Sequence, residues 1–102
     1  MVLESKKKVL LNRTFVIGCG KLGASIANER AKKGKNVIVV DSHNDAFLYL
    51  SKDFSGDTGI CDAMEIKTLK KHGLANAREV IITTGDDNTN IFLCYAISKL
   101  CS

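Results

Sequence analysis

The sequence predicts an α/β fold built on a doubly wound parallel sheet of about four strands, with helices on both faces. Short apolar, β-branched segments alternate with longer segments of helix formers over residues 14–100. The segment "NVIVVD" is apolar at consecutive positions, which is typical of a strand in a parallel sheet that helices cover on both sides. With right-handed crossovers, we expect the spatial strand order 3-2-1-4, with a crevice between the carboxyl ends of the first and fourth strands.

Residues 1–13 are polar and lysine-rich, and we expect them to form a flexible lead-in to a single domain over 14–102. The segment "TFVIG" at 14–18 predicts the first buried strand, because it is short, apolar and β-branched. A helix should follow over residues 21–33 and end at Gly34, a residue type that is common just after a helix. The buried side of this helix would carry Leu22, Ile26 and Ala27.

The remaining elements continue the alternation. Ser42 or Asn44 can cap a second helix that runs to about Lys52, with Phe47 and Leu50 pointing inward. Further strands are expected at 36–41, within 55–63 and at 78–84, and further helices at 64–72 and 88–100. The last helix carries apolar side chains at helical spacing: Ile91, Cys94, Ile97 and Cys101.

The composition is that of an ordinary globular domain, with 45% apolar and 25% charged residues and a net charge of +4. The lysines at 6–8 and 32–35 are not interleaved with aromatic residues. We therefore interpret them as a solvated tail and an exposed helix end rather than a nucleic-acid site. No apolar run approaches the roughly 18 residues that a membrane span needs. The four cysteines include no C-x-x-C pair, and we expect reduced thiols in a cytosolic protein.

The segment "GCGKLG" at 18–23 follows the first expected strand and opens the first expected helix, as a dinucleotide-binding G-x-G-x-x-G motif requires. Gly18 would allow the tight turn, Gly20 the close approach of a pyrophosphate, and Gly23 the close packing of helix on strand. The unpaired N–H groups at the start of the helix would hold the phosphates, and Lys21 would add a mobile charge. A tight turn without a ligand is the structural alternative.

Asp41 ends the second expected strand, about 20 residues after Gly20, where a carboxylate can accept hydrogen bonds from the adenosine ribose. A carboxylate there would repel the 2′-phosphate of NADP(H). The neighbouring Ser42 and His43 supply no arginine that would bind one. The pattern therefore favours NAD(H) or ATP/ADP as the ligand of a Rossmann-like fold.

Little in the sequence supports catalysis. Tyr95 and Lys99 form a Y-x-x-x-K pair on the expected last helix. Short-chain dehydrogenases use such a pair for acid–base chemistry, so a small NAD-dependent oxidoreductase, or a fragment of one, is the alternative function. An exposed Tyr–Lys pair explains the same residues. Asp86 and Asp87 can be an acid–base or metal-binding pair, or a turn that caps the next helix. We expect neither an enzyme nor a metal site.

Three segments carry a resemblance to a known family: "VIGCGKLGASIA", "VIVVDSHNDAFLYLSKDFSGDTGICDA" and "VIITTGDDNTNIFLCYAISK". Over about residues 14–100 the chain resembles the RCK/KTN (TrkA-N) regulatory domain of potassium channels and Trk/Ktr potassium uptake systems. The resemblance implies a dimerising domain that binds NAD(H) or ATP/ADP and catalyses no reaction. Such dimers form a cytoplasmic ring at the inner face of the membrane, whose ligand state biases a potassium-conducting subunit. A bare assembly module without a ligand is a third alternative.

The resemblance also implies the ligand-binding residues. The phosphates would lie on Gly18, Gly20, Lys21, Leu22 and Gly23, the ribose on Asp41 beside Ser42, the adenine near Cys61, Asp62 and Ala63, and the far side of the crevice on Thr83, Thr84 and Asn88. Asn90 would support the turn of the last helix. The chain departs from the family at Cys61, where the family usually has glycine. The resemblance also implies two further strands after the last helix, and we expect this sequence not to include them.

Overall fold

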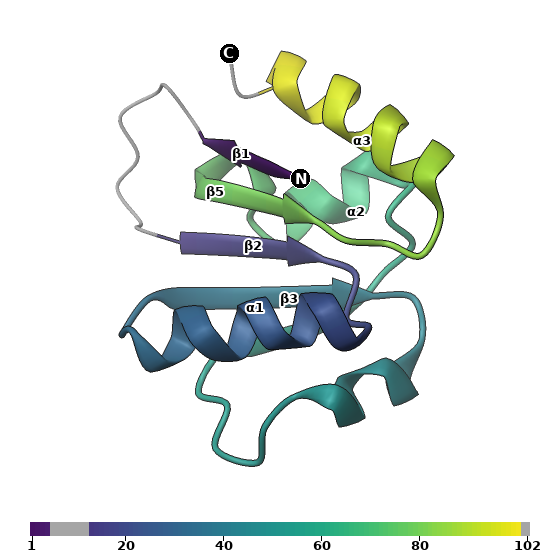
Figure 1. The fold of residues 1–102 in the computed structure, drawn as a ribbon. Coiled ribbons are helices and arrows are strands. Elements are labelled where there is room, and N and C mark those ends of the chain that lie inside the picture. The colour runs from purple at the N-terminus through teal and green to yellow at the C-terminus, as the bar shows by residue number, and fades with distance from the viewer. Residues whose placement is uncertain (5–12, 101–102) are drawn as a thin grey trace.

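The computed structural model describes residues 1–4 and 13–100, and its centre is a five-stranded sheet (Figure 1). The four expected strands are β2 (Arg13–Ile17), β3 (Asn36–Asp41), β4 (Asp57–Ile60) and β5 (Ala77–Ile82). They are parallel and lie in the order β5-β2-β3-β4, which confirms the predicted order 3-2-1-4. Because Ile17 pairs with both Val40 and Ile82, the carboxyl ends of the three central strands meet at one edge.

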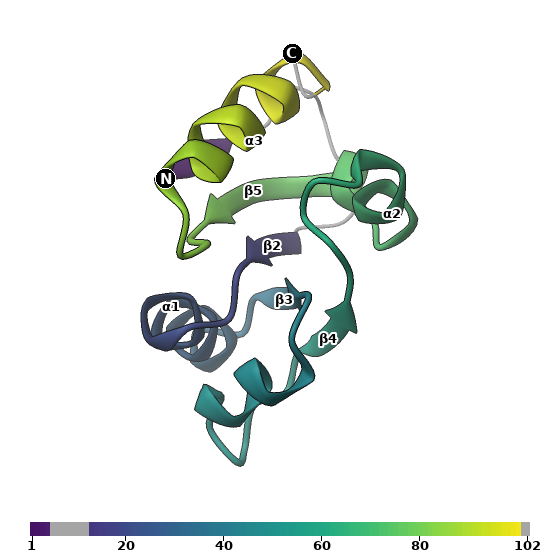
Figure 2. The same cartoon turned by 90° about the vertical axis from the view of Figure 1, so that its right-hand side faces the viewer.

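Helices cover both faces of the sheet, as the apolar strands predicted (Figure 2). Helix α1 (Lys21–Lys32) packs with the short 3₁₀ helix η1 (Asn44–Tyr49) on one face. Helices α2 (Ile66–Lys71) and α3 (Asp87–Leu100), with the 3₁₀ turn η2 (Leu74–Asn76), cover the other. The chain therefore has the α/β, Rossmann-like architecture.

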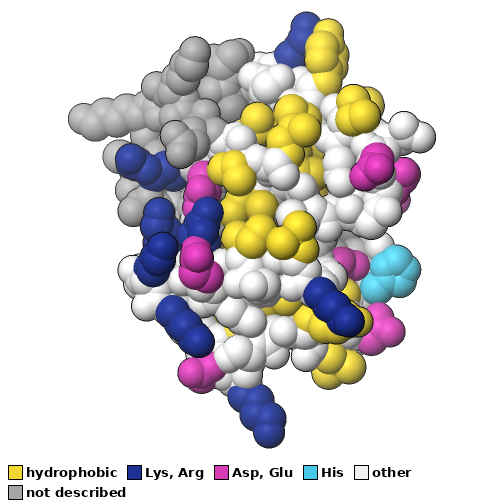
Figure 3. Space-filling view, viewed as in Figure 1, with side chains coloured by type: hydrophobic (Ala, Val, Ile, Leu, Met, Phe, Trp, Pro, Cys, Tyr) yellow, Lys and Arg dark blue, Asp and Glu magenta, His cyan; other side chains and the backbone are white. Residues whose placement is uncertain are grey.

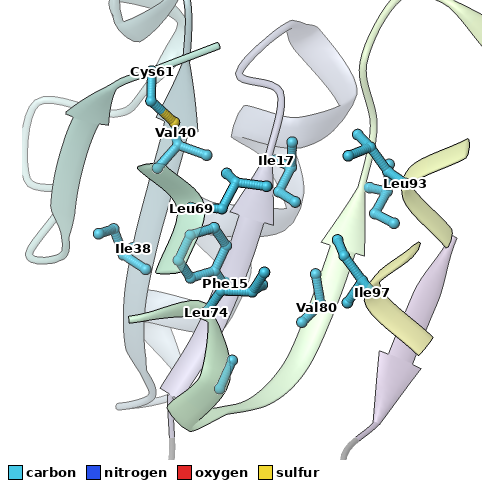
Figure 4. Close-up of a cluster of buried hydrophobic side chains, with 12 residues drawn as sticks. Phe15, Ile17, Ile38, Val40, Cys61, Leu69, Leu74, Val80, Leu93 and Ile97 are labelled. Carbon is cyan, nitrogen blue, oxygen red and sulfur yellow. The ribbon is translucent and has the colours of Figure 1, made fainter. Parts of the chain in front are cut away.

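Two hydrophobic clusters hold these layers together. Alternate residues of β2 point to opposite faces, so that Phe15 and Ile17 lie in one cluster and Val16 in the other. The cluster beneath α2 and α3, shown in Figure 4, contains Phe15, Ile17, Ile38, Val40, Leu69, Leu74, Val80, Ile82, Leu93 and Ile97 among others. The cluster beneath α1 contains Val16, Cys19, Ala24, Ala27, Val37, Val39 and Ile81.

The expected lead-in over residues 1–13 needs correction at both ends. Residues Val2–Glu4 form a strand, β1, that pairs antiparallel with β5, and Arg13 already belongs to β2. Strand β1 forms because the edge of β5 offers unpaired backbone groups and Leu3 packs against the apolar cluster beneath α3. The rest of the expected lead-in, residues 5–12, lies outside the described part of the chain.

Some helix boundaries and orientations also differ from expectation. The helix expected over 44–52 is a shorter 3₁₀ helix, and the one expected over 64–72 is limited to Ile66–Lys71. Leu22 and Ile91, expected to be buried, are 65% and 64% exposed. Leu22 stands in the first turn of α1 and lines the cleft, whereas Ile91 lies in the second turn of α3. The small residues Gly23, Ala24 and Ala27 instead form the buried side of α1, and Leu93 and Ile97 that of α3.

Candidate functional site

A cleft of about 1170 Å³ opens at the edge of the sheet where the parallel strands end. The loop between β2 and α1 and the loop between β5 and α3 form two of its walls. The residues after β3 and β4 complete it, and Met1 contributes from the amino-terminal side. This is the position at which doubly wound folds bind ligands, because the connections of neighbouring strands diverge there.

The turn between β2 and α1 requires glycine at two of its three glycine positions. Gly18 has a φ of +103°, and a Cβ there would lie 2.5 Å from the carbonyl oxygen of Thr83. A Cβ on Gly23 would lie only 1.9 Å from the carbonyl oxygen of Gly18. Gly18 therefore allows the turn to lie close to the end of β5, and Gly23 allows α1 to lie close to the turn.

Gly20 differs from the other two glycines. It precedes α1 with a φ of −74°, which any residue can adopt, and a Cβ there would have no atom within 4 Å. Within the described chain, no side chain caps α1, and its first turn holds no acidic residue. Gly20, Lys21 and Leu22 all line the cleft. The start of α1 thus presents bare backbone N–H groups and the positive end of the helix dipole to this space.

The side chain of Asp41, at the end of β3, organises the opposite side of this turn. Its Oδ2 accepts a hydrogen bond from the Cys19 N–H over 2.8 Å, and its Oδ1 accepts one from the His43 N–H over 2.9 Å. The carboxylate keeps further lone pairs toward the cleft, which it lines. Burial, together with the Asp41 charge, raises the pKa of the Cys19 thiol to about 11. Cys19 is therefore a neutral, buried thiol at neutral pH.

Thr83 joins β5 to the glycine turn. Its N–H donates to the Ile17 carbonyl over 2.8 Å, and its hydroxyl donates to the Gly18 carbonyl over 3.0 Å. The hydroxyl also stands where a side chain on Gly23 would go, 2.6 Å from the Cβ position. Thr83 thereby fixes the distance between the two walls of the cleft.

The loop after Thr83 is held by Asn90. The Thr84 N–H donates to Asn90 Oδ1 over 3.1 Å, and Asn90 Nδ2 donates to the Thr84 carbonyl over 3.1 Å. Asp86 caps α3, because its Oδ1 accepts from the Asn88 N–H over 3.2 Å and its Oδ2 from the Thr89 hydroxyl over 2.7 Å. The hydrogen bond from Thr89, followed by that from Asn88, lowers the pKa of Asp86. The capping interpretation of Asp86 is therefore confirmed.

Comparison with known proteins decides the family. Residues 14–102 match the TrkA-N domain. The chain belongs to the TrkA-N family. The Rossmann-like fold of TrkA-N domains is a nucleotide-binding fold, and this chain has that fold.

Two curated proteins are similar to this TrkA-N chain. The "Trk system potassium uptake protein TrkA" of Streptomyces coelicolor is 31% identical over 78 residues, which cover 74% of this chain and 34% of that protein. An uncharacterised protein of Methanothermus fervidus is 24% identical over 102 residues, which cover 96% of this chain and 16% of that protein. The chain thus spans about a third or less of the length of these relatives.

The loop after β4 forms the last wall of the cleft in this TrkA-N domain. The Cys61 N–H donates to the Asp41 carbonyl over 3.1 Å, and the Met64 N–H donates to Asp62 Oδ1 over 2.9 Å. Cys61, where the resemblance led us to expect glycine, is only 6% exposed and belongs to the cluster beneath α2 and α3. Burial raises the pKa of its thiol. The core therefore accommodates the Cys61 side chain while its backbone still borders the cleft.

The structure gathers most of the residues that the sequence assigned to the site. The cleft is lined by Gly18, Gly20, Lys21, Leu22, Asp41, Ser42, Cys61, Asp62, Ala63, Thr83 and Thr84. Two assigned residues do not line it: Gly23 lies beneath the turn, and Asn88 points its N–H at Asp86. Sequence reasoning missed Met1, His43 and Tyr49, which do line the cleft. Of these three, only His43 carried a signal, since it lies two residues after Asp41.

The Tyr95–Lys99 pair lies apart from the cleft. The Lys99 ammonium stands 4.8 Å from the centre of the Tyr95 ring, and Tyr95 is 63% exposed on α3. Neither residue lines the cleft. The pair therefore lies outside the cleft that the glycine turn borders.

Proposed function

We propose that this TrkA-N domain binds NAD(H) or ATP/ADP in the cleft and thereby regulates potassium transport. The observation that carries the proposal is Gly20, which the fold itself does not require to be glycine. Its bare backbone at the uncapped start of α1 is explained if phosphate groups occupy the open space. Asp41 and Thr83 hold the two sides of the turn by hydrogen bonds with Cys19 and Gly18.

The proposed ligand extends across the cleft from the phosphates to the adenine. Its phosphates lie at the N–H groups that begin α1, with Lys21 beside them. Its adenosine ribose donates to Asp41, and its adenine borders the loop that begins at Cys61. Asp41 disfavours a 2′-phosphate by charge repulsion, so NADP(H) should bind more weakly than NAD(H).

We further propose that the domain acts through a membrane partner. The relative from Streptomyces coelicolor bears the name of a potassium uptake protein, and we place this domain at the inner face of the membrane beside a potassium-conducting subunit. None of the helices described in this chain is long and apolar enough to cross a membrane. We propose that the regulator lies on the cytoplasmic side of the membrane and assembles as a dimer or larger ring.

Exposed hydrophobic side chains support self-assembly. They gather in the upper half of the face shown in Figure 3, the region where Figure 1 places β1 and α3. The exposed large residues of these two elements are Val2, Ile91, Phe92 and Tyr95. Exposed apolar side chains that gather on one face are typical of interfaces between proteins.

The proposed signal is a difference in affinity between two states of the assembly. A ligand shifts a conformational equilibrium only if it binds one state more tightly. The adenosine end is common to all candidate ligands, so Asp41 should supply affinity without choosing a state. The discriminating contacts should lie at Lys21 and in the loop from Thr84 to Asn88. Since no substrate is transformed in this account, we propose that the domain is not an enzyme.

The proposal is tested by thermal unfolding with NAD, NADH, ATP, ADP and NADP at matched concentrations. A ligand that binds only the folded state at 100 times its Kd stabilises that state by about 2.7 kcal/mol. We expect NAD(H) or the adenine nucleotides to raise the midpoint clearly more than NADP does. A midpoint unchanged by all five would contradict nucleotide binding and favour the bare assembly module. The variant Tyr95→Phe serves as the control and should respond like the wild type.

A further inference from the structure

We propose that strand β1 is a functional part of the nucleotide site and that nucleotide binding and the pairing of β1 with β5 are coupled. This inference rests on the proposed function. It starts from a feature that the sequence did not predict, namely that the first residues of the chain return to the carboxyl edge of the sheet. In Figure 2, the amino terminus lies beside the loop that joins β5 to α3.

Met1 and Ile82 anchor β1 at the cleft. The Ile82 N–H donates to the Met1 carbonyl over 2.8 Å, and the Met1 nitrogen donates to the Ile82 carbonyl over 3.1 Å. Residues that exchange both bonds form a hydrogen-bonded pair of an antiparallel ladder. Met1 itself lines the cleft and is 54% exposed. The residue just before β1 thus forms part of one wall of the proposed site.

Ile82 is followed directly by Thr83, which sets the geometry of the glycine turn. The Thr83 hydroxyl holds the Gly18 carbonyl, and the Thr83 N–H reaches across to β2 at Ile17. At the end of β5, consecutive N–H groups therefore bond to β1 on one side and to β2 on the other. Pairing with β1 restrains this end of β5, and with it the distance between the two walls of the cleft.

The two contributions make β1 a positioning element. If attached β1 improves nucleotide binding, nucleotide binding must favour attachment by the same factor. Hydrogen exchange at the Ile82 amide reports on this attachment, because the Ile82 N–H donates to the Met1 carbonyl, next to β1. The neighbouring Thr83 amide is an internal control, because its N–H donates to the Ile17 carbonyl of β2 and not to β1.

The alternation of the ladder supplies a matched pair of variants. Since Met1 and Ile82 form a hydrogen-bonded pair, Leu3 and Val80 form the next hydrogen-bonded pair. Val2 and Ile81, which lie between them, form a non-hydrogen-bonded pair. Proline at position 3 therefore removes a ladder hydrogen bond, whereas proline at position 2 removes an N–H that faces away from β5. The variant Leu3→Ala removes the packing of Leu3 but keeps its N–H.

The test measures affinities for ADP and NAD by calorimetry and amide hydrogen exchange with and without saturating ligand. We expect Leu3→Pro to weaken binding by about fivefold or more and Val2→Pro to bind nearly as the wild type. Leu3→Ala should weaken binding less than Leu3→Pro, because it keeps the ladder hydrogen bond but loses the packing that also holds β1. In the wild type, ligand should slow exchange at Ile82 more than at Thr83. This second measurement needs no variant, so it decides the matter even if Leu3→Pro fails to fold.

Two negative results would have different meanings. If the wild type binds ADP or NAD but ligand leaves Ile82 exchange unchanged and the proline variants bind equally, β1 is merely an edge strand and the inference is wrong. If the wild type binds neither nucleotide, the proposed function fails, and the inference fails with it.

Discussion

The Thr83 hydroxyl donates a hydrogen bond to the Gly18 carbonyl over 3.0 Å, while a Cβ on Gly18 would lie 2.5 Å from the Thr83 carbonyl oxygen. This reciprocal contact joins the two loops that bind nucleotide in the proposed function. It explains why position 18 needs glycine whether or not a ligand binds: any side chain there would collide with the Thr83 carbonyl. It also separates the glycines that build the turn from the one that would serve a ligand.

The three glycines of the turn should respond differently to alanine. Gly18→Ala and Gly23→Ala place a Cβ against backbone atoms, at 2.5 and 1.9 Å, and should each lower the free energy of unfolding by more than about 2 kcal/mol. Gly20→Ala meets open space and should cost at most about 1 kcal/mol, as expected for alanine before a helix. Urea unfolding measures all three, and equal losses would refute the distinction.

Replacing Thr83 by valine keeps the shape of the side chain but removes its hydroxyl. The Gly18 carbonyl then loses its partner, which should lower the free energy of unfolding by about 1–2 kcal/mol and weaken nucleotide binding. The control is Thr58→Val, because Thr58 lies exposed on β4. Urea unfolding and calorimetry should show an effect at position 83 alone, and matching losses at both positions would count against the contact.

Glu79 should make stability depend on acid pH. Burial raises its pKa, but hydrogen bonds from Arg30 over 2.8 Å and Thr14 over 2.9 Å outweigh this, so that the folded-state pKa lies below 4.5. Because the folded-state pKa is lower than the unfolded-state pKa, ionised Glu79 stabilises the fold at a pH above the unfolded-state pKa. This stabilisation is lost as the pH falls through the folded-state pKa. Glu79→Gln should therefore flatten the dependence of unfolding on pH below about 4.5. If Glu79→Gln left the dependence of the unfolding free energy on pH unchanged, this role of Glu79 would be contradicted.

The cysteines should differ in their reaction with iodoacetamide at pH 8. Burial and the Asp41 charge raise the pKa of Cys19 to about 11, and burial raises that of Cys61. Since only the thiolate reacts, both should be modified far more slowly than in urea-unfolded protein. Cys94, which is less buried, is the internal comparison. Mass spectrometry of the digested protein assigns the sites, and rapid labelling of Cys19 would show that the turn opens readily.

The sequence predicted those parts of the fold that depend on apolar patterning. The strands β2, β3 and β5 are apolar at consecutive positions because both of their faces are covered, and this pattern is legible without a structure. Strand β1 was missed, because three residues beside a lysine-rich segment carry no periodicity. Its position depends on the free edge of β5, a property of the assembled sheet.

The site was predictable to the extent that a motif fixes its own geometry. The glycine turn and Asp41 lie where the spacing placed them, because a strand, a tight turn and a helix leave few alternatives. Leu22 illustrates the limit: its spacing suits a buried helical face, yet it stands in the first turn of α1 and lines the cleft instead. Asn90 as the clamp of Thr84 depends on how the loop folds back, which spacing does not reveal.

The most direct test of nucleotide binding at the glycine turn is an amide chemical-shift titration of ¹⁵N-labelled protein with ADP and with NAD. We predict that the largest changes occur at Gly20, Lys21 and Leu22, whose N–H groups begin α1, with smaller changes around Asp41 and Thr84. The variant Gly20→Ala should fold and lose these changes. No change with either nucleotide, or changes confined to α3 and its Tyr95–Lys99 pair, would contradict the account.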